Sequence, residues 1–307
     1  MEKTLRGACV IGQSGGPTSV INSSLVGVFK AAKDAGVEKI YGMRNGIEGF
    51  LNKKVVDMSE YVKNELDIEL LKRTPSSFLG TCRFKLPSVE ESEATYKLLF
   101  SIMEELDIKY FFYIGGNDSM DTIKKLSNYA EEIGSDIRFM GVPKTIDNDL
   151  AVTDHTPGYG SAAKYIASAL KEIIRDVNTY PTESVTVVEI MGRNAGWLTA
   201  AAALSRAEDC PGPDLIYLPE VTFDYDRFLE QVKAVKKKKT SVVIAVSEGI
   251  KLANGEYVCE DNKQATFEDS FGHKSLGGTA LYLADFIGAN LGVKSRGIVF
   301  STLQRLS

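Results

Sequence analysis

Short apolar runs alternate with amphipathic helical patterns along nearly the whole of this chain. Runs typical of buried strands occur at 7–12, 109–114, 139–142, 185–190 and 241–246. Between them, apolar side chains three or four residues apart indicate helices, as in the set Leu99, Ile102, Met103 and Leu106. Strands that alternate with helices predict parallel sheets with helices on both faces. We therefore expect an α/β protein with two doubly wound, mainly parallel sheets.

The length of the chain indicates two domains. Its 307 residues exceed the size typical of a single domain. The clearest break in the alternation is the loop at 150–160. We expect one domain over residues 1–155 and another over 156–307, with the active site in the cleft between them.

Charge and cysteine content exclude several classes of protein. Acidic residues number 41 and basic residues 36, a net charge of −5, which argues against a nucleic-acid partner. The four cysteines show no CxxC spacing and there are only two histidines, so neither a zinc site nor a disulfide framework is expected. The chain contains no run of 18 apolar residues and no signal-peptide pattern. We therefore expect a cytoplasmic protein without a membrane partner.

Polar loops follow several of the predicted strands. In sheets of this kind, ligands bind beyond the carboxyl ends of the strands. The loops after Ile11, Ile114, Val142, Ile190 and Val246 are also the ones rich in Gly, Asp, Arg and Lys. Position and composition together place the functional site in these loops.

Two of these loops are rich in glycine. Gly15 and Gly16 open a helical pattern, and backbone amides at a helix N-terminus bind phosphate. A simple tight turn is the alternative for this loop. Gly115 and Gly116 precede Asp118, which could hold Mg²⁺ directly or through water; the alternative role of Asp118 is a helix cap.

The densest polar run lies at 143–149. Lys144 and Thr145 precede two carboxylates, Asp147 and Asp149. Phosphoryl transfer to an alcohol needs an acceptor for the hydroxyl proton, cations for the phosphate charge and rigid positioning. This run supplies these groups, whereas a turn built from Asp and Asn would leave the Lys and Thr unexplained.

Two further loops carry charge. Arg193 follows Gly192 and can bind phosphate oxygens with its forked guanidinium. Trp197 is close by, and we expect it to anchor the core. Glu248 suits a sugar hydroxyl, with a surface acid as the alternative.

These loops form an ordered set of motifs. They are 13–22 (QSGGPTSVIN), 46–51 (GIEGFL), 78–84 (FLGTCRF), 115–119 (GGNDS), 141–149 (GVPKTIDND), 153–160, 188–197 (VEIMGRNAGW), 247–249 (SEG) and 303–305 (LQR). The chain resembles the phosphofructokinase family over essentially its whole length. The resemblance implies transfer of a phosphoryl group to the 1-hydroxyl of fructose 6-phosphate, in glycolysis.

The resemblance also implies roles for single residues. Asp147 corresponds to the base that takes the hydroxyl proton, and Arg193 to the cation that stabilises the transferring group. Thr145 corresponds to a partner of the sugar and the transferred group. The other implied contacts are Gly16, Arg83, Asp118 and Lys144 to the donor, Met191, Gly192, Glu248 and Asp149 to the sugar side, and Asp118, with Asp149 nearby, to the metal, Mg²⁺.

The donor is predicted from two positions. ATP-using members of the family carry Gly where this chain has Asp118 and Lys144, whereas pyrophosphate-using members carry Asp and Lys. A carboxylate 4 Å from a nucleotide phosphate would cost ~4 kcal/mol at an effective dielectric constant of 20. Lys144 supplies a compact cation for a donor that lacks a nucleoside. We expect a reversible, pyrophosphate-dependent phosphofructokinase.

The chain departs from the family at several positions. Asn117 replaces a metal-associated Asp, Thr302 replaces a His or Tyr of the sugar loop, and Ser184 replaces an Arg that reaches a neighbouring subunit's sugar phosphate. Arg296 matches the second such Arg, so a homodimer or homotetramer is expected. Sedoheptulose 7-phosphate is an alternative acceptor.

The sequence leaves two alternative functions. They are an ATP-dependent phosphofructokinase, which Asp118 and Lys144 oppose, and a non-catalytic sugar-phosphate-binding subunit, which Asp147 and Arg193 oppose.

Family members continue beyond the LQR segment, so we expect a truncated chain whose first domain lacks part of its apolar cover.

Overall fold

The computed structural model describes residues 6–261 and 277–306. The chain forms two compact units, the first ending at Thr145 and the second beginning at Ile146. The division therefore lies within the 141–149 motif, whereas the sequence places it between residues 155 and 156. Each unit is described by itself.

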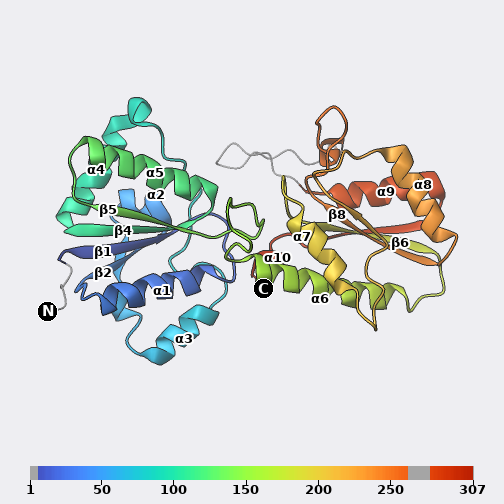
Figure 1. The fold of residues 1–307 in the computed structure, drawn as a ribbon, viewed down its shortest axis with the longest axis horizontal. Helices are drawn as coiled ribbons and strands as arrows, with labels where there is room; N and C mark the ends of the chain where they lie inside the picture. The colour runs from blue at the N-terminus through green and yellow to red at the C-terminus, as the bar shows by residue number, and fades with distance from the viewer. Residues whose placement is uncertain (1–5, 262–276, 307) are drawn as a thin grey trace. The chain divides into compact units, whose positions relative to one another are not determined.

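The first unit contains a five-stranded sheet (Figure 1). Its strands are β1 (Ala8–Gln13), β2 (Ile40–Met43), β3 (Val55–Asp57), β4 (Ile108–Gly115) and β5 (Arg138–Pro143), in the order β3-β2-β1-β4-β5. All neighbours are parallel except β2 and β3. The strand order changes direction at β1, which has β2 on one side and β4 on the other. Such a switch point leaves a crevice beyond the carboxyl ends of β1 and β4.

Helices cover both faces of this sheet, as predicted (Figure 1). One face packs against α1 (Ile21–Asp34) and α3 (Glu65–Arg73), next to the short helix η1 (Met58–Glu60). The other face packs against α2 (Gly46–Leu51), α4 (Val89–Glu105) and α5 (Asn117–Glu132). The α/β prediction is confirmed for this unit.

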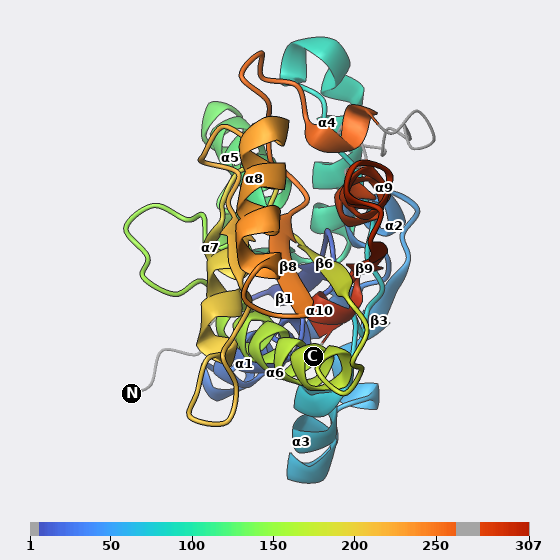
Figure 2. The same cartoon turned by 90° about the vertical axis from the view of Figure 1, so that its right-hand side faces the viewer.

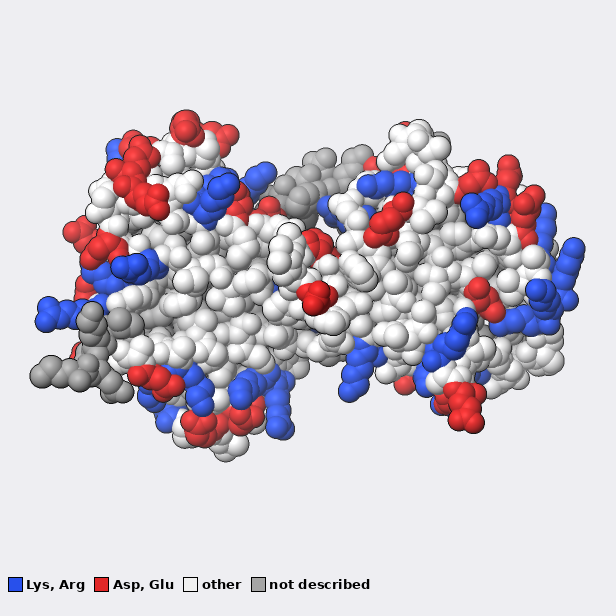
Figure 3. Space-filling view, viewed as in Figure 1, with Lys and Arg blue, Asp and Glu red and all other residues white. Residues whose placement is uncertain are grey.

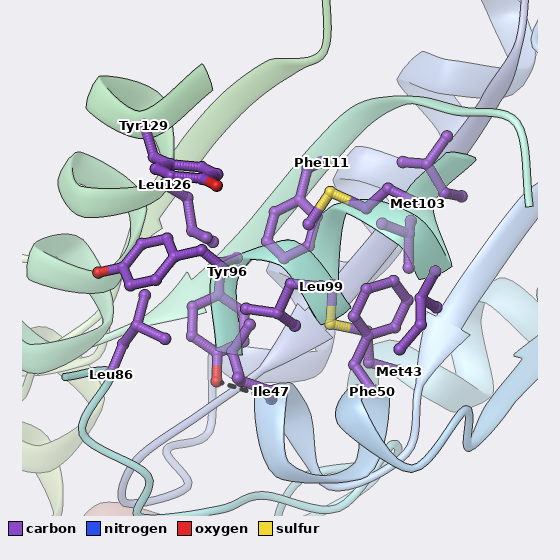
Figure 4. Close-up of a cluster of buried hydrophobic side chains, with 14 of the residues drawn as sticks. Met43, Ile47, Phe50, Leu86, Tyr96, Leu99, Met103, Phe111, Leu126 and Tyr129 are labelled. Carbon is purple, nitrogen blue, oxygen red and sulfur yellow. Dashed lines mark hydrogen bonds between the residues drawn. The ribbon is translucent and has the colours of Figure 1, made fainter. Parts of the chain in front are cut away.

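The α4 face shows how the sequence determines a helix and its packing. Ser88 and Glu91 form the reciprocal capping box at the start of α4, with the Ser88 N–H donating to Glu91 Oε2 at 2.7 Å. Leu99 and Met103, one turn apart, are completely buried against Phe111 of β4 (Figure 4). Tyr96 and Tyr129 extend this core toward α5.

The second unit contains a four-stranded sheet that is parallel throughout. Its strands are β6 (Ser184–Ile190), β7 (Leu215–Tyr217), β8 (Ser241–Ser247) and β9 (Lys294–Val299), in the order β7-β8-β6-β9. The central strands β6 and β8 coincide with two of the predicted apolar runs. Their burial on both faces explains why the sequence is almost continuously apolar there.

Helices cover both faces of this sheet (Figure 1 and Figure 2), and alternating side chains of β6 pack against them. Val185 and Val187 pack in a cluster with α8 (Tyr225–Lys236) and α9 (Thr279–Leu291). Val188 and Ile190 pack in a second cluster with α6 (Tyr159–Val177), α7 (Trp197–Ala200) and η2 (Ala201–Ser205). The remaining elements of this unit are η3 (Val258–Asp261) and α10 (Leu303–Leu306). The α/β prediction is confirmed here too.

The prediction that Trp197 anchors the core is wrong. Its side chain is 55% exposed, while the next two residues, Leu198 and Thr199, are completely buried. Because α7 has only four residues, these two side chains occupy its inward face. Trp197 instead lines an open hollow together with the 148–155 loop.

Two features are relevant to binding partners: the distribution of surface charge and the apolar character of the helices. On the faces of the two units drawn in Figure 3, Lys and Arg side chains are mixed with Asp and Glu side chains. Over residues 6–261 and 277–306, none of the helices has the length and apolar character needed to cross a bilayer.

The core of the first unit provides a matched pair of substitutions in α4. Leu99→Ala removes a completely buried side chain and should lower the free energy of unfolding by about 2–5 kcal/mol in urea denaturation. Leu98→Ala changes a neighbour that is 45% exposed and should alter stability by less than about 0.5 kcal/mol. Equal effects of the two substitutions would contradict this assignment of the core.

Candidate active site

Backbone hydrogen bonds join three loops at the carboxyl edge of the first sheet. The N–H of Ser14, after β1, donates to the Ile114 carbonyl of β4 at 2.9 Å. The N–H of Lys144, after β5, donates to the Gly115 carbonyl at 2.9 Å. The glycine loop, the start of α5 and Lys144 therefore lie together, as the strand-end rule predicts.

Lys144 lies against the glycine loop. Its side chain is buried, with 5% exposure. A Cβ atom on Gly15 would lie 3.2 Å from the Lys144 ammonium nitrogen, and Gly15 has φ +76°. The left-handed backbone conformation favours glycine at position 15, and the absence of a side chain leaves room for the ammonium group. The arrangement places a positive charge directly beside a loop of backbone amides.

Two helix N-termini reach the same edge. Neither α1 nor α5 has a side-chain cap, since the capping positions are Val20 and Gly116. Uncapped amides at a helix N-terminus attract anions. Asp118 lies in the first turn of α5 and is partly buried. Gly116, and not Asp118, occupies the N-cap position of α5.

Arg83 is brought to the glycine loop by the segment that precedes it. The Gly15 N–H donates to the Cys82 carbonyl at 3.3 Å, and the Thr81 hydroxyl donates to the Gly15 carbonyl at 2.7 Å. Arg83 itself is exposed. The predicted donor residues Gly16, Arg83, Asp118 and Lys144 thus come from segments that meet at one edge of the first unit.

In the second unit, the loops after β6 and β8 are hydrogen-bonded to each other. The Ser247 hydroxyl donates to the Gly192 carbonyl at 2.7 Å, and the Gly192 N–H donates to Glu248 Oε1 at 3.3 Å. A Cβ atom on Gly249 would lie 1.9 Å from the Arg193 carbonyl oxygen. Only glycine at position 249 lets the two backbones pass this closely, which fixes the backbone that carries Arg193.

Glu248 belongs to a charged group in the second unit. Its pKa is raised to about 7, mainly by burial. The hydrogen bond from the Gly192 N–H lowers the pKa, the negative charges of Glu189 and Asp147 raise it, and Arg193 lowers it. These four charged side chains therefore lie close enough to interact. Glu248 is therefore not a surface acid, and three of the predicted residues, Asp147, Arg193 and Glu248, come together.

The side chain of Asn148 holds the loop that carries Asp147 and Asp149. Asn148 has φ +58°, its Oδ1 accepts from the Thr156 N–H at 2.8 Å, and its Nδ2 donates to the Asp154 carbonyl at 3.1 Å. These bonds close the loop across eight residues of sequence. Asp147 is partly buried and Asp149 is exposed.

Three residues that support this site were not singled out from the sequence. Glu189 is buried in β6 and accepts from the Ala280 N–H at 3.0 Å and the Gly278 N–H at 3.3 Å, which caps α9. Gln304 accepts from the Met191 N–H at 3.2 Å, and Glu220 accepts from the Gly196 N–H at 2.6 Å. An acid inside the apolar run VTVVEI was a visible signal for Glu189. Gln304 lies in the motif at 303–305, but the contacts of Gln304 and Glu220 join distant parts of the chain and have no local signal.

Arg296 lies apart from this group. It pairs with Thr186 in the β6–β9 ladder, before the carboxyl end of the sheet, and is exposed. Together with Asp176, Tyr180 and Ser184, it lines a cavity of about 130 Å³. The structure thus does not bring Arg296 to the residues around Glu248.

The side chains of the described residues do not form a metal site by themselves. Within the part of the chain that the structure describes, no three His, Cys, Asp or Glu side chains form a group that could hold a metal. Mg²⁺ is commonly bound by one or two carboxylates together with substrate phosphates. Asp118, beside the glycine loop, fits that mode of binding and not a site made of protein ligands alone.

The pKa of Glu248 predicts a pH-dependent stability. Its folded value of about 7 lies above the ordinary 4.5, so the folded state holds this proton more tightly than the unfolded state. The cost of ionising it develops as pH rises from 4.5 to 7 and is complete above 7. Glu248→Gln should leave stability near pH 4.5 unchanged and raise the free energy of unfolding at pH 8 by about 1–3 kcal/mol.

Chemical denaturation at the two pH values measures this difference. Glu230→Gln replaces an exposed carboxyl of the same unit and serves as the control, with little change at either pH. Equal changes in the free energy of unfolding for the two variants at pH 8 would show that ionising Glu248 does not destabilise the folded state.

Comparisons with known proteins identify relatives along the whole chain. A family model described as phosphofructokinase matches residues 8–299. The pyrophosphate–fructose 6-phosphate 1-phosphotransferase of Xanthomonas campestris pv. campestris is 42% identical over 301 residues, covering 97% of this chain and 71% of the relative. The protein of the same name from Rhodospirillum rubrum is 40% identical over 306 residues, covering 98% of this chain and 73% of the relative.

A solved structure agrees with these sequence relatives. The crystal structure of pyrophosphate-dependent phosphofructokinase from Nitrosospira multiformis has a TM-score of 0.84 and 35% sequence identity, covering 98% of this chain and 70% of that one. The fold, the ordered motifs and the relatives lead to the same conclusion: the chain belongs to the phosphofructokinase family.

Proposed function

We propose that this protein transfers a phosphoryl group from pyrophosphate to the 1-hydroxyl of fructose 6-phosphate, reversibly, giving fructose 1,6-bisphosphate and phosphate. The observation that carries this proposal is the pair Lys144 and Asp118 at the glycine loop. Lys144 is buried with its ammonium nitrogen beside Gly15, and Asp118 lies in the first turn of α5. The names of relatives about 40% identical support the same reaction.

The two units take different parts in the reaction under this proposal. The donor-binding residues Gly16, Arg83, Asp118 and Lys144 lie in the first unit, and the acceptor-binding residues Asp147, Met191, Gly192 and Glu248 lie in the second. Thr145 is the last residue of the first unit, adjoining both sets along the chain. The donor-binding and acceptor-binding residues are then divided between Thr145 and Ile146, within the 141–149 motif.

The chemical step uses residues of the second unit together with Thr145 of the first. The carboxylate of Asp147 accepts the proton of the 1-hydroxyl as its oxygen attacks the nearer phosphorus of pyrophosphate. The bond from that phosphorus to the bridging oxygen breaks, and inorganic phosphate leaves. Arg193 stabilises the charge on the transferring group with its guanidinium, and Thr145 positions that group. The Glu248 carboxyl and the 191–192 backbone orient the sugar.

Asp118 is the residue that would hold Mg²⁺ together with the phosphates of the donor. A bound Mg²⁺ neutralises phosphate charge and orients the donor. Lys144 and the uncapped N-termini of α1 and α5 supply further positive potential at the same edge. Asp149 is proposed as an acceptor-side residue.

Donor choice follows from electrostatics at the glycine loop. Lys144 adds a localised positive charge, which stabilises a small, highly charged donor most strongly. The carboxylate of Asp118 would repel a further phosphate of a nucleotide. A donor that ends at its second phosphate avoids that repulsion, which favours pyrophosphate over ATP.

We also propose that a second copy of the chain completes the acceptor site. Arg296 is exposed and lies away from the Glu248 group, so its guanidinium is available to bind the sugar 6-phosphate held by a neighbouring subunit in a homodimer or homotetramer. Sedoheptulose 7-phosphate is a further candidate acceptor. A cytoplasmic location suits these soluble substrates.

Removing the proposed base tests the chemistry. Asp147→Asn keeps the size of the side chain but cannot accept the hydroxyl proton. It should lower kcat by about 10²–10⁴-fold with little change in KM for fructose 6-phosphate. Steady-state kinetics of the full chain measure both constants. Retention of wild-type kcat would exclude Asp147 as the base.

Exchanging the donor-selecting pair tests the choice of pyrophosphate. The double change Asp118→Gly with Lys144→Gly should raise kcat/KM for ATP relative to pyrophosphate by at least about tenfold, because it removes the repelling carboxylate and the diphosphate-binding cation. Asp121→Gly, an acid of the same helix that pairs with Lys125 at 2.8 Å, is the control. An unchanged donor ratio in the double variant would overturn the assignment.

A further inference from the structure

Tyr113 is a buried polar side chain that neither the predicted site nor the proposed chemistry uses. It lies on β4 and is 1% exposed. Its hydroxyl accepts from the Ile47 N–H at 3.2 Å and lies 3.7 Å from Cys82 Sγ. Burial raises the pKa of this phenol, so the hydroxyl stays neutral and can both donate and accept.

The two partners of this hydroxyl belong to separate segments. Cys82 precedes Arg83, and Ile47 lies in the first turn of α2. The Ser14 hydroxyl, at the start of the glycine loop, donates to the Cys82 carbonyl at 3.5 Å. The Tyr113 hydroxyl therefore connects the segment that carries Arg83 to α2, and Cys82 connects that segment to the glycine loop.

The packing around the ring leaves it little freedom. A Cβ atom on Gly12 would lie 2.6 Å from the Tyr113 ring, and a Cβ atom on Gly46 would lie 2.7 Å from its hydroxyl oxygen. The chain has glycine at both positions. The ring is thereby held in one place, and its hydroxyl is a rigid reference for the loops above it.

We propose that Tyr113 is a positioning residue for pyrophosphate: its hydroxyl holds Cys82, which in turn holds the glycine loop, so that this loop and Arg83 meet the donor phosphates. This inference rests on the proposed function. Tyr113 does not touch the substrate itself in this arrangement. Loss of the hydroxyl should therefore weaken donor binding and leave acceptor binding unchanged.

Tyr113→Phe removes only the hydroxyl, and Tyr96→Phe is a matched control. Tyr96 is also completely buried in the same core and donates its hydroxyl to the Pro87 carbonyl at 2.7 Å. Tyr113→Phe should raise KM and Kd for pyrophosphate about 5- to 20-fold, with KM for fructose 6-phosphate within about twofold. Tyr96→Phe should change KM for either substrate by less than about twofold. This should hold even if thermal unfolding shows that the two variants lose equal stability.

Calorimetric titration of the full chain with pyrophosphate, and steady-state kinetics with both substrates, separate the outcomes. A wild type that neither binds nor uses pyrophosphate overturns the proposed function and this inference with it. A wild type that uses pyrophosphate, with Tyr113→Phe indistinguishable from Tyr96→Phe, overturns the inference alone. Should Tyr113→Phe fail to fold, Ser14→Ala removes the hydrogen bond between the glycine loop and the Cys82 carbonyl and should raise KM for pyrophosphate without changing KM for the sugar.

Discussion

The close approach of the Lys144 ammonium group to the glycine loop is the constraint on which the rest of the donor site depends. Burying a cation is costly unless the surroundings compensate its charge. Lys144 follows β5 at the carboxyl edge of the first sheet, and Asp118 lies in the first turn of α5, which follows β4. Gly15 has φ +76°, and its lack of a side chain leaves room for the ammonium group beside the loop. A compact dianionic or more highly charged ligand is the natural occupant of such an edge.

The second unit uses the opposite charge for a different purpose. The charges of Glu189 and Asp147 act on the Glu248 carboxyl, with Arg193 as the counter-charge. Glu189 accepts hydrogen bonds from the amides at the start of α9. Thr279, the first residue of that helix, donates to the Glu248 carbonyl at 3.3 Å. The α9 terminus thus connects the ends of β6 and β8, and it fixes the position of the group proposed to hold the sugar.

Local patterns predicted much of this fold, and long-range contacts account for what they missed. The apolar spacing of Leu99, Ile102 and Met103 is local, and it is confirmed in α4. The strand-end rule placed the functional loops because parallel strands have their carboxyl ends at the same edge of a sheet. Trp197 was predicted wrongly because the shortness of α7 cannot be read from its composition. Gln304 lies in the motif at 303–305, but its contact with Met191, 113 residues away, has no local signal.

The donor preference of the wild-type protein tests the central claim most directly. Initial rates of fructose 6-phosphate phosphorylation, measured on the same preparation with pyrophosphate and with ATP, give kcat/KM for each donor. The charges at the glycine loop predict a value for pyrophosphate at least about tenfold above that for ATP, which corresponds to about 1.4 kcal/mol in transition-state free energy. A higher value for ATP would contradict the account, because Lys144 and Asp118 would then not select the donor.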